Sequence, residues 1–220
     1  IGNGQPWDLG RLHGGVHTLP PYEQAKGTDW YKGTANAIYQ NISFIDSYDP
    51  EYVIILSGDQ ICKQDYADFL RFHKEKGAEF SVAVMEVDWK EASRFGLMVA
   101  DENDKITEFQ EKPPVPKSNL ASMGIYIFNW DVLKKYLEED EADPNSKNDF
   151  GMNIIPALLR DGRKMYAYHF NGYWRDVGTI DSLWEANMEV LDPENSGIDI
   201  FDKKWKIYSR NPVLPAQKIG

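Results

Sequence analysis

The sequence has a single cysteine, Cys62, among 220 residues. One cysteine cannot form a disulfide within the chain, so the fold must be held by its core. No stretch approaches the roughly 20 apolar residues that a membrane-spanning helix requires, and no signal-peptide pattern opens the chain. These absences predict a protein of a reducing, cytoplasmic setting.

Basic residues are outnumbered, since 24 Lys and Arg stand against 35 Asp and Glu, for a formal net charge of -11. Binding to nucleic acid or to an anionic membrane depends on basic side chains that neutralise phosphates, so the sequence argues against both partners. An anionic substrate would have to meet a local group of cations. A length of 220 residues with 42% hydrophobic content suffices for one substantial domain.

Short apolar runs alternate with helical patterns, which is typical of an α/β fold with a mixed but mostly parallel sheet flanked by helices. The predicted strands span residues 52–56, 80–87, 106–109, 124–128 and 165–170. The predicted helices span residues 35–48, 66–76, 132–138, 150–160 and 180–191. The last helix has three candidate caps: Thr179, Asp181, or a capping box from Ser182 to Glu185.

Two acidic motifs lie far apart in the chain. The apolar run 52–56 is followed by Ser57-Gly58-Asp59, and Asp176 is followed by a Gly-Thr turn that opens a helix. Ligands of open α/β sheets collect outside the carboxyl ends of the strands, so Asp59 and Asp176 are expected to converge on one divalent ion. The alternative is that each acid only caps a turn.

Seven short motifs follow one another along the chain. They are Trp30-Tyr-Lys-Gly-Thr-Ala-Asn-Ala37, Ser57-Gly-Asp59, Arg94-Phe-Gly96, Glu108-Phe-Gln-Glu-Lys-Pro113, Ala121-Ser-Met-Gly-Ile-Tyr126, Asn148-Asp-Phe-Gly151 and Trp174-Arg-Asp-Val-Gly-Thr179. Each motif is weak alone, but the ordered set leaves little room for coincidence. In this order they resemble the catalytic domain of the bacterial glucose-1-phosphate adenylyltransferase family. The resemblance covers nearly the whole chain and implies a Rossmann-like nucleotidyltransferase domain.

The resemblance implies transfer of the adenylyl group of ATP to glucose 1-phosphate, which gives ADP-glucose and pyrophosphate in glycogen synthesis. Such a reaction needs alignment of two anions and neutralisation of charge more than a covalent nucleophile. Asp59 and Asp176 are the implied ligands of Mg²⁺, which prefers one or two carboxylates with phosphate oxygens and water.

The resemblance also implies sugar-phosphate contacts. Lys112 meets the phosphate as a compact cation and acts with the two aspartates as a catalytic group, while Glu111 accepts hydrogen bonds from glucose hydroxyls. Ser122 is a second sugar contact, and Gly96, in a Phe-Gly turn, lets the backbone approach the ligand. Without the resemblance, a solvated charge pair is the more probable explanation of Glu111 and Lys112. The start of a strand is the alternative for Ser122, and a plain turn explains Gly96 equally well.

On the nucleotide side, the resemblance places Tyr31 near the base or ribose and Gly33-Thr34 near the adenine. A hydrophobic staple before a helix is the competing explanation for Tyr31. The four histidines have no metal-ligand spacing. They are His13, His17, His73 and His169.

Three parts of the family pattern lead to expectations about a longer chain. The Gly-rich phosphate loop with its arginine is expected before Ile1, together with a central strand, and a left-handed β-helix is expected after the Pro-rich end. Residues 1–192 are thus predicted to form the catalytic domain, incomplete at its N-terminus, and residues 193–220 a linker. The family is typically tetrameric and allosterically regulated, so a homotetramer, or a hetero-oligomer with a related subunit, is expected.

Substitutions within the motifs leave alternatives open. The family usually has His where this chain has Gln60 and Tyr where it has Cys62, and it often has Lys at the position of Met152. Gln60 cannot carry a charge, and Met152 removes a cation, so a non-catalytic regulatory subunit of the same enzyme is one alternative. A sugar-1-phosphate nucleotidyltransferase that uses another nucleoside triphosphate and a binding module without catalysis are the others.

Overall fold

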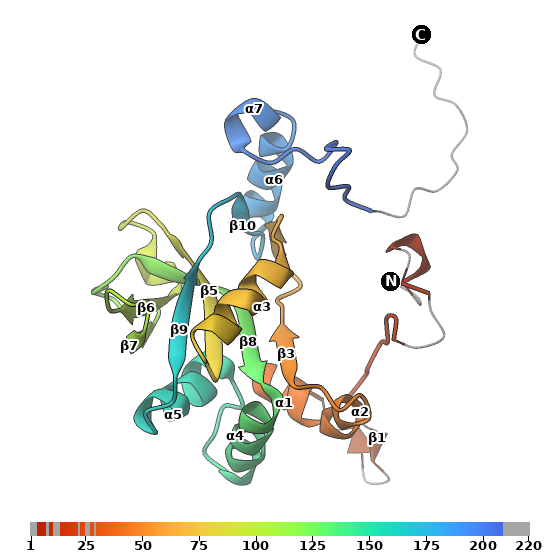
Figure 1. Cartoon of the computed structure of the whole chain (residues 1–220), viewed down its shortest axis with the longest axis vertical. Coiled ribbons are helices and arrows are strands. Elements are labelled where there is room, and N and C mark those ends of the chain that lie inside the picture. Colours follow the sequence, from red (N-terminus) through yellow and green to blue (C-terminus); the bar gives the residue numbers. More distant parts are fainter. Residues whose placement is uncertain are drawn as a thin grey trace. The chain divides into compact units, whose positions relative to one another are not determined.

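The computed structural model describes residues 4–7, 9–10, 14–21, 23–24, 27–28 and 30–208. Contacts divide the chain into two units, and the larger one, Pro21–Ala186, contains the sheet (Figure 1). The smaller unit consists of Ile1–Pro20 and Asn187–Gly220. Among the described residues, no helix has the length and apolar character needed to span a bilayer.

A six-stranded mixed sheet forms the centre of the larger unit. Its order is β7 (Ile106–Glu111), β6 (Gly96–Ala100), β8 (Leu120–Asn129), β5 (Phe80–Glu86) and β9 (Met165–His169), and β3 (Tyr52–Ile55) also pairs with β8. β8 is antiparallel to β3, β5 and β6, whereas β9 is parallel to β5, so β3, β5, β6 and β9 share one direction. β7 is antiparallel to β6 and runs with β8. The predicted α/β fold with a mixed sheet flanked by helices is confirmed. The expected parallel character lies in the shared direction of β3, β5, β6 and β9, since β5 with β9 is the one parallel pairing among the described strands of this sheet.

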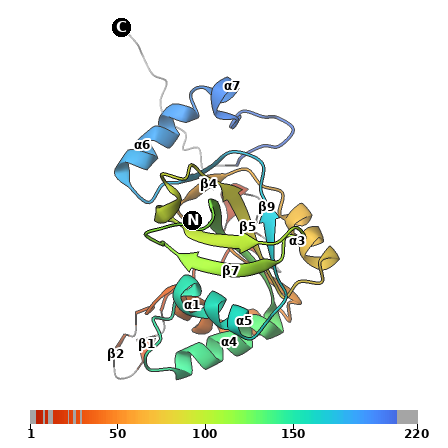
Figure 2. The ribbon, with the colours of Figure 1, turned by 90° about the vertical axis from the view of Figure 1, so that its left-hand side faces the viewer.

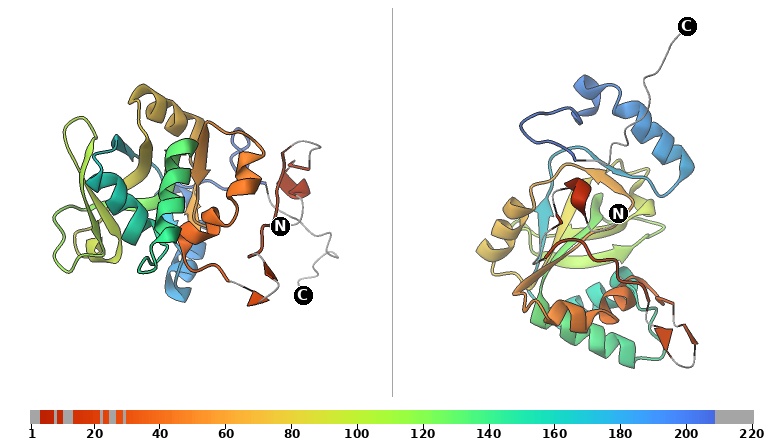
Figure 3. Two further views of the ribbon diagram at one scale, coloured as in Figure 1. Left: turned by 90° about the horizontal axis from the view of Figure 1, so that it is seen from below. Right: turned by 90° about the vertical axis from the view of Figure 1, so that its right-hand side faces the viewer.

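Helices cover both faces of this sheet because β8 alternates its buried side chains between two clusters. Phe128 packs in the cluster that includes residues of α4 (Trp130–Ala142) and α5 (Ile155–Arg160). Met123, Ile125 and Ile127 point to the opposite face and pack with Phe69 of α3 (Tyr66–Glu75). Successive strand residues face opposite sides, so one apolar strand supplies both cores. Figures 2 and 3 show α1 (Thr34–Tyr39) beside α4 on the first face.

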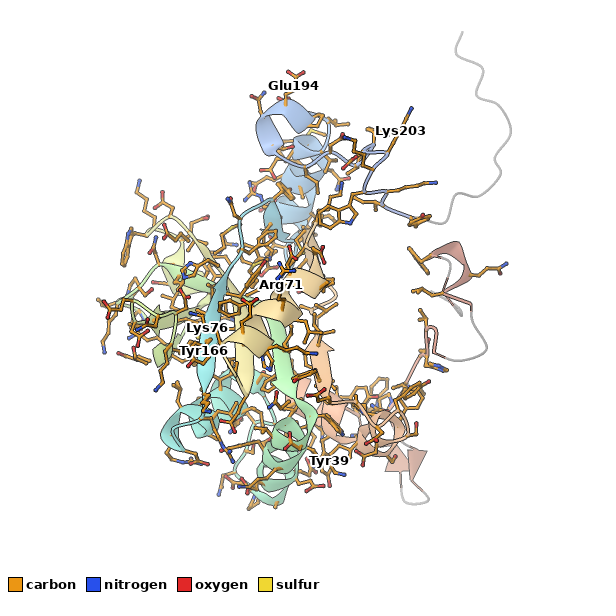
Figure 4. All side chains as sticks on the ribbon, viewed as in Figure 1. Tyr39, Arg71, Lys76, Tyr166, Glu194 and Lys203 are labelled. Carbon is orange, nitrogen blue, oxygen red and sulfur yellow. The ribbon has the colours of Figure 1, made fainter. Side chains whose placement is uncertain are left out.

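Local signals set the ends of α3, which was predicted at residues 66–76. The Asp65 carboxylate accepts a hydrogen bond from the Ala67 amide at 2.8 Å, and Gly77 follows the helix in the left-handed region with φ +57°. At the same end, Lys76 lies near the Tyr166 ring (Figure 4) and donates a 2.9 Å hydrogen bond to the Asp104 carboxylate. The helix is therefore tied to the neighbouring turn and strand.

Several elements differ from the sequence-based expectations. The helix predicted at 35–48 is two helices, α1 and α2 (Ile42–Asp46), and between them Asn41 donates its side-chain amide to the Ala37 carbonyl at 2.8 Å. Such side-chain bonds to the backbone compete with a continuous helix. The apolar run 52–56, which is typical of a buried strand, forms β3 at residues 52–55, but Ile54 is 39% exposed, because β3 pairs with β8 alone among the described residues.

Further short elements were not predicted. They are the two-residue strands β1 (Glu23–Gln24) and β2 (Gly27–Thr28), the ribbon of β4 (Gln60–Cys62) and β10 (Trp174–Asp176), the strand β6, and the 3-10 helices Gln5–Trp7 and Ala92–Arg94. The helix predicted at 150–160 is present as the π-helix Phe150–Ile154 followed directly by α5.

The C-terminal region begins with α6 (Ile180–Glu189), whose cap is Thr179, because the Ser182 amide donates to the Thr179 hydroxyl at 3.2 Å. A short helix, α7 (Pro193–Ser196), follows and ends at Gly197 with φ +76°. The domain boundary between residues 192 and 193 stays a prediction. Residues 209–220 of the predicted linker lie outside the described part of the chain.

His73 is a fully buried polar residue between α3 and the sheet. Its ring nitrogens lie 2.8 Å from the Ser81 hydroxyl and 2.9 Å from the Asn129 side-chain oxygen. Burial lowers the pKa of His73 below its ordinary value of 6.5. The buried imidazole is therefore held neutral by its surroundings and satisfied by two hydrogen bonds.

This environment makes stability depend on pH. Below about pH 6.5 the unfolded chain protonates this histidine while the folded chain does not, so the free energy of unfolding falls as the pH is lowered, by up to about 1.4 kcal/mol per pH unit. Urea unfolding at about pH 7.5 and 5.5 measures the loss, and His73→Gln should flatten it. Equal losses in both proteins would show that other groups cause the pH dependence.

Candidate active site

A cavity of about 480 Å³ lies against the sheet within the larger unit. Residues from α1, β3, β4, β6, β7, β8, β10 and the π-helix line it, so it draws on segments far apart in the sequence. Its polar lining residues are Thr34, Ser57, Gln60, Arg94, Glu111, Lys112, Ser122, Tyr126, Asp149, Trp174 and Asp176.

The ribbon of β4 and β10 brings the two singled-out aspartates together. Gln60 pairs with Asp176, and the Val177 amide donates to the Asp59 carbonyl at 2.9 Å. A Cβ added to Gly178 would lie 3.1 Å from Oδ1 of Asp176 and 3.8 Å from Oδ2 of Asp59. Both carboxylates therefore border one small space that the missing side chain leaves open.

The hairpin of β6 and β7 forms a second wall. Its register places Gly96 opposite Glu111, and Cβ atoms added to Gly96 or Gly151 would lie 3.1 Å and 2.7 Å from Oε2 of Glu111. The absent side chains thus make room for the Glu111 carboxylate. Gly96 begins a strand rather than occupying the predicted turn, because it is paired in this hairpin.

Lys112 ends this wall in an unusual backbone conformation. Its φ is +44°, in the left-handed region that costs energy for residues other than glycine, and its amide donates to the Phe95 carbonyl at 3.2 Å. The Lys112 side chain is 65% exposed, and its ammonium lies 4.0 Å from the Glu111 carboxylate. The turn therefore carries an accessible cation beside an acid.

Burial changes the titration of two groups in the wall. Burial raises the pKa of Glu111, the Lys112 ammonium opposes this shift, and the Asp149 carboxylate adds to it. Burial also raises the pKa of Tyr126 to about 12, so its hydroxyl stays protonated at neutral pH. The cavity therefore offers a neutral hydroxyl next to an acid that holds its proton more firmly than usual.

A bulge in β8 shapes the floor. The pairing with β5 shifts at this point, Gly124 has φ +67°, and its amide donates to the Ser122 hydroxyl at 3.2 Å. Nε2 of Gln60 lies 3.0 Å from the position of a Gly124 Cβ. Oε1 of Gln60 and Nε1 of Trp174 are enclosed without a hydrogen-bond partner in the described part of the chain. Such unpaired groups are uncommon in folded proteins.

Asp149 joins the start of the π-helix to α1. Its carboxylate accepts hydrogen bonds from the Met152 amide at 2.9 Å and from the Thr34 hydroxyl at 3.0 Å, and the Phe150 amide donates to that hydroxyl at 3.1 Å. Wide π-turns occur often at functional sites. Gly33 packs against the carbonyl of Lys147, where a Cβ would approach to 2.7 Å. These contacts place Thr34 and Asp149 in the cavity wall.

The predicted site residues thus fall into two groups. Those that line the cavity are Thr34, Gly96, Glu111, Lys112, Ser122 and Asp176. Asp59 is not in the lining, but its carboxylate borders the same open space beside Gly178 as that of Asp176. The cavity lining does not include Tyr31, whose hydroxyl accepts a hydrogen bond from Asn41, or Gly33. Their nucleotide-binding role stays a prediction.

The assignment of Asp59 and Asp176 as metal ligands stays a prediction. Within the described residues, no group of three or more His, Cys, Asp or Glu is arranged to hold a metal ion. Around Gly178, the described residues therefore offer two carboxylates, those of Asp59 and Asp176, as candidate metal ligands. His13 lies outside the described residues, and Met152 is 59% exposed and absent from the cavity lining.

Sequence reasoning did not single out six of the polar lining residues as site residues. They are Ser57, Gln60, Arg94, Tyr126, Asp149 and Trp174. Each lies within or next to a motif that carried the resemblance, so motif membership was an available signal. What the motifs did not convey is which side chain of each segment faces the cavity.

Comparison with known proteins decides the family. A profile described as nucleotidyl transferase matches residues 4–193. The chain belongs to the nucleotidyl transferase family. Relatives of this nucleotidyl transferase include the glucose-1-phosphate adenylyltransferases of Clostridium beijerinckii, 66% identical over 220 residues, and Desulforamulus reducens, 60% identical over 220 residues. Both matches cover 100% of this chain but only 57% and 55% of the relatives, so the chain spans somewhat more than half of their length.

The Thr34 hydroxyl gives a testable prediction for this nucleotidyl transferase. Thr34→Val removes the hydrogen bond to one oxygen of the Asp149 carboxylate and the acceptor of the Phe150 amide, so we expect the free energy of unfolding to fall by about 0.5–1.5 kcal/mol. Urea unfolding measures the change. Thr34→Ser keeps the hydroxyl and serves as control, and equal losses in the two variants would assign the effect to packing of the methyl group.

Proposed function

We propose that the full-length polypeptide transfers the adenylyl group of ATP to α-D-glucose 1-phosphate. A phosphate oxygen of the sugar phosphate attacks the α-phosphorus of ATP, a new P–O bond forms, and the bond to the bridging oxygen breaks, releasing pyrophosphate and ADP-glucose. The main support is the one cavity whose lining brings Glu111, Lys112 and Ser122 together with Asp176. The names and identities of the relatives add to it.

In this proposal the reacting anions meet opposite charge at two places. The exposed Lys112 ammonium binds the phosphate of the sugar substrate and neutralises charge that develops during transfer. Glu111 and Ser122 hold the sugar ring by hydrogen bonds to its hydroxyls, which orients the attacking oxygen. Because Gly96 and Gly151 keep space around Glu111, its carboxylate can turn toward a ligand.

Asp59 and Asp176 are the proposed ligands of Mg²⁺. Two carboxylates beside an open space fit an ion that keeps waters and phosphate oxygens in its coordination sphere. When bound, the ion would neutralise phosphate charge and align the reactants. The Ser57 hydroxyl, which donates to Asp59, holds that carboxylate in place.

Several finer features belong to the same proposal. The product would enter glycogen synthesis in the cytoplasm, where a lone cysteine stays reduced. Tyr31, Gly33 and Thr34 would contact the nucleotide. By the resemblance to the family, the full-length polypeptide assembles as a tetramer or with a related subunit and responds to an allosteric effector.

Pyrophosphate release by the full-length polypeptide tests the function. With ATP, glucose 1-phosphate and Mg²⁺ we expect release that is lowered by about 100-fold or more in Asp59→Asn, since the change removes a principal electrostatic group of on the order of 3 kcal/mol. Asp68→Asn, an exposed surface acid on α3, is the matched control and should keep full activity.

The nucleotide and the variants separate the alternatives. Faster release with UTP, dTTP or GTP than with ATP would assign another sugar nucleotide. A folded protein that binds ATP or glucose 1-phosphate but releases no pyrophosphate with any nucleotide would be a regulatory subunit. Unchanged function of Asp59→Asn would point to a binding module without catalysis.

The space between the aspartates gives a separate prediction about Mg²⁺. Gly178→Ala places a methyl group within 3.1 Å of Asp176 Oδ1 and 3.8 Å of Asp59 Oδ2, so we expect the Mg²⁺ concentration for half-maximal activity to rise by about tenfold. Gly58→Ala, whose added methyl group meets no atom within 4 Å, is the control. Equal Mg²⁺ requirements in wild type and Gly178→Ala would place the metal elsewhere.

A further inference from the structure

Arg94 and Lys112 extend from the same end of the β6–β7 hairpin. The register sets Gly96 opposite Glu111. Arg94 lies two residues before Gly96, and Lys112 lies one residue after Glu111. A 3.2 Å hydrogen bond from the Lys112 amide to the Phe95 carbonyl continues the pairing beyond the strands. The backbone thus places two cationic residues side by side in the cavity wall.

The segment that carries Arg94 is firmly positioned. Arg94 is the last residue of a 3-10 turn that begins at Ala92, which is fully buried. Phe95 packs its ring on Trp174 with centroids 5.5 Å apart, and both residues line the cavity with Arg94. A cavity-lining side chain on such an anchored segment loses less entropy on ligand binding than one on a free loop.

Charge in the cavity favours an anion contact for Arg94. The described lining includes three acids, Glu111, Asp149 and Asp176, but only two cations, Arg94 and Lys112. A sugar phosphate is close to a dianion at neutral pH, so a single lysine in this acidic setting leaves charge uncompensated. The planar guanidinium suits two phosphate oxygens at once.

The present partner of Arg94 does not hold it strongly. Its guanidinium lies 3.1 Å from the Glu91 carboxylate one turn away, and both side chains are more than half exposed, at 58% and 51%. Exposed pairs of this kind contribute little free energy, so a phosphate can compete for the arginine. Arg71 on α3 offers the same arrangement with Asp68 at 2.7 Å but does not line the cavity (Figure 4).

We propose that Arg94 binds the phosphate group of the sugar-phosphate substrate together with Lys112, and so acts as a specificity-determining residue for phosphorylated over free sugar. This inference rests on the proposed function and assigns a residue that the sequence motifs did not assign to the site. The Arg94–Glu91 pair opens when the phosphate binds.

Kinetics and direct binding with the full-length polypeptide test this role. In Arg94→Ala we expect the KM and the Kd for glucose 1-phosphate to rise by about tenfold or more, with the KM for ATP changed less than about twofold. Arg94→Lys should recover part of the affinity, since lysine keeps the positive charge but lacks the planar guanidinium that can donate to two phosphate oxygens at once. Binding of free glucose, which lacks the phosphate, should not respond to either change.

Matched variants separate this role from a general loss of charge. Arg71→Ala removes an equivalent surface pair and should leave both constants unchanged, and Glu91→Ala should leave them unchanged or lower the Kd. The assignment is overturned if Arg94→Ala changes the Kd for glucose 1-phosphate by less than about twofold, if the KM for ATP rises as much, or if Arg71→Ala has the same effect.

The measurement of the Kd for glucose 1-phosphate tests this inference separately from the proposed reaction. If the wild-type protein binds glucose 1-phosphate but releases no pyrophosphate from ATP, the adenylyl transfer is wrong while the Kd of Arg94→Ala still decides the role of the arginine. If glucose 1-phosphate does not bind to the wild type, both are overturned.

Discussion

The antiparallel pairing of β4 with β10 is the constraint on which the candidate active site depends. The two strands come from opposite ends of the larger unit, and each has only three residues. Their register sets Gln60 against Asp176, and Asp59 is held at the adjacent position by its carbonyl bond to the Val177 amide. Without this ribbon, two aspartates that repel each other would have no reason to stay close, because like charges at short range cost energy unless a cation intervenes.

Glycines at close approaches complete the arrangement that the ribbon begins. Gly178 leaves space between the aspartates, and Gly96 and Gly151 leave space around Glu111. A methyl group at Gly178 or Gly151 would meet a carboxylate oxygen first, and one at Gly96 would meet both the Phe109 ring and the Glu111 carboxylate. The site therefore places acids beside bare backbone, where a polar ligand or ion can take the volume that a side chain would fill.

The sequence predicted the elements whose signals are local, and it missed those that exist through a partner. Helix α3 carries its own cap at Asp65 and its own stop at Gly77, so its bounds follow from neighbouring residues. β4, β10 and β6 are too short or too mixed in polarity to show a period, and their pairing depends on residues far along the chain. Asn41 breaks a periodic helix through one side-chain bond that periodicity does not register.

The same division applies to the site. Asp59, Lys112 and Asp176 stand in motifs whose chemistry can be read from residue types. The cavity positions of Arg94 and Tyr126 follow instead from the β6–β7 register and from the bulge in β8 at Gly124. A motif predicts which segment takes part, whereas the sheet geometry decides which of its side chains faces the ligand.

The departures from the family pattern carry less weight in three dimensions than in the sequence. Met152 is 59% exposed and absent from the cavity lining, so the cation lost there is not one of the wall's charges. Gln60 remains in the lining, and its amide lies against the bare Gly124 with one oxygen unpaired. A neutral amide beside Asp59 neither adds a positive charge to compete with a metal ion nor titrates near neutral pH, as an imidazole would. Both substitutions are therefore compatible with a catalytic subunit, and the charge balance of the cavity then depends on Lys112 and Arg94.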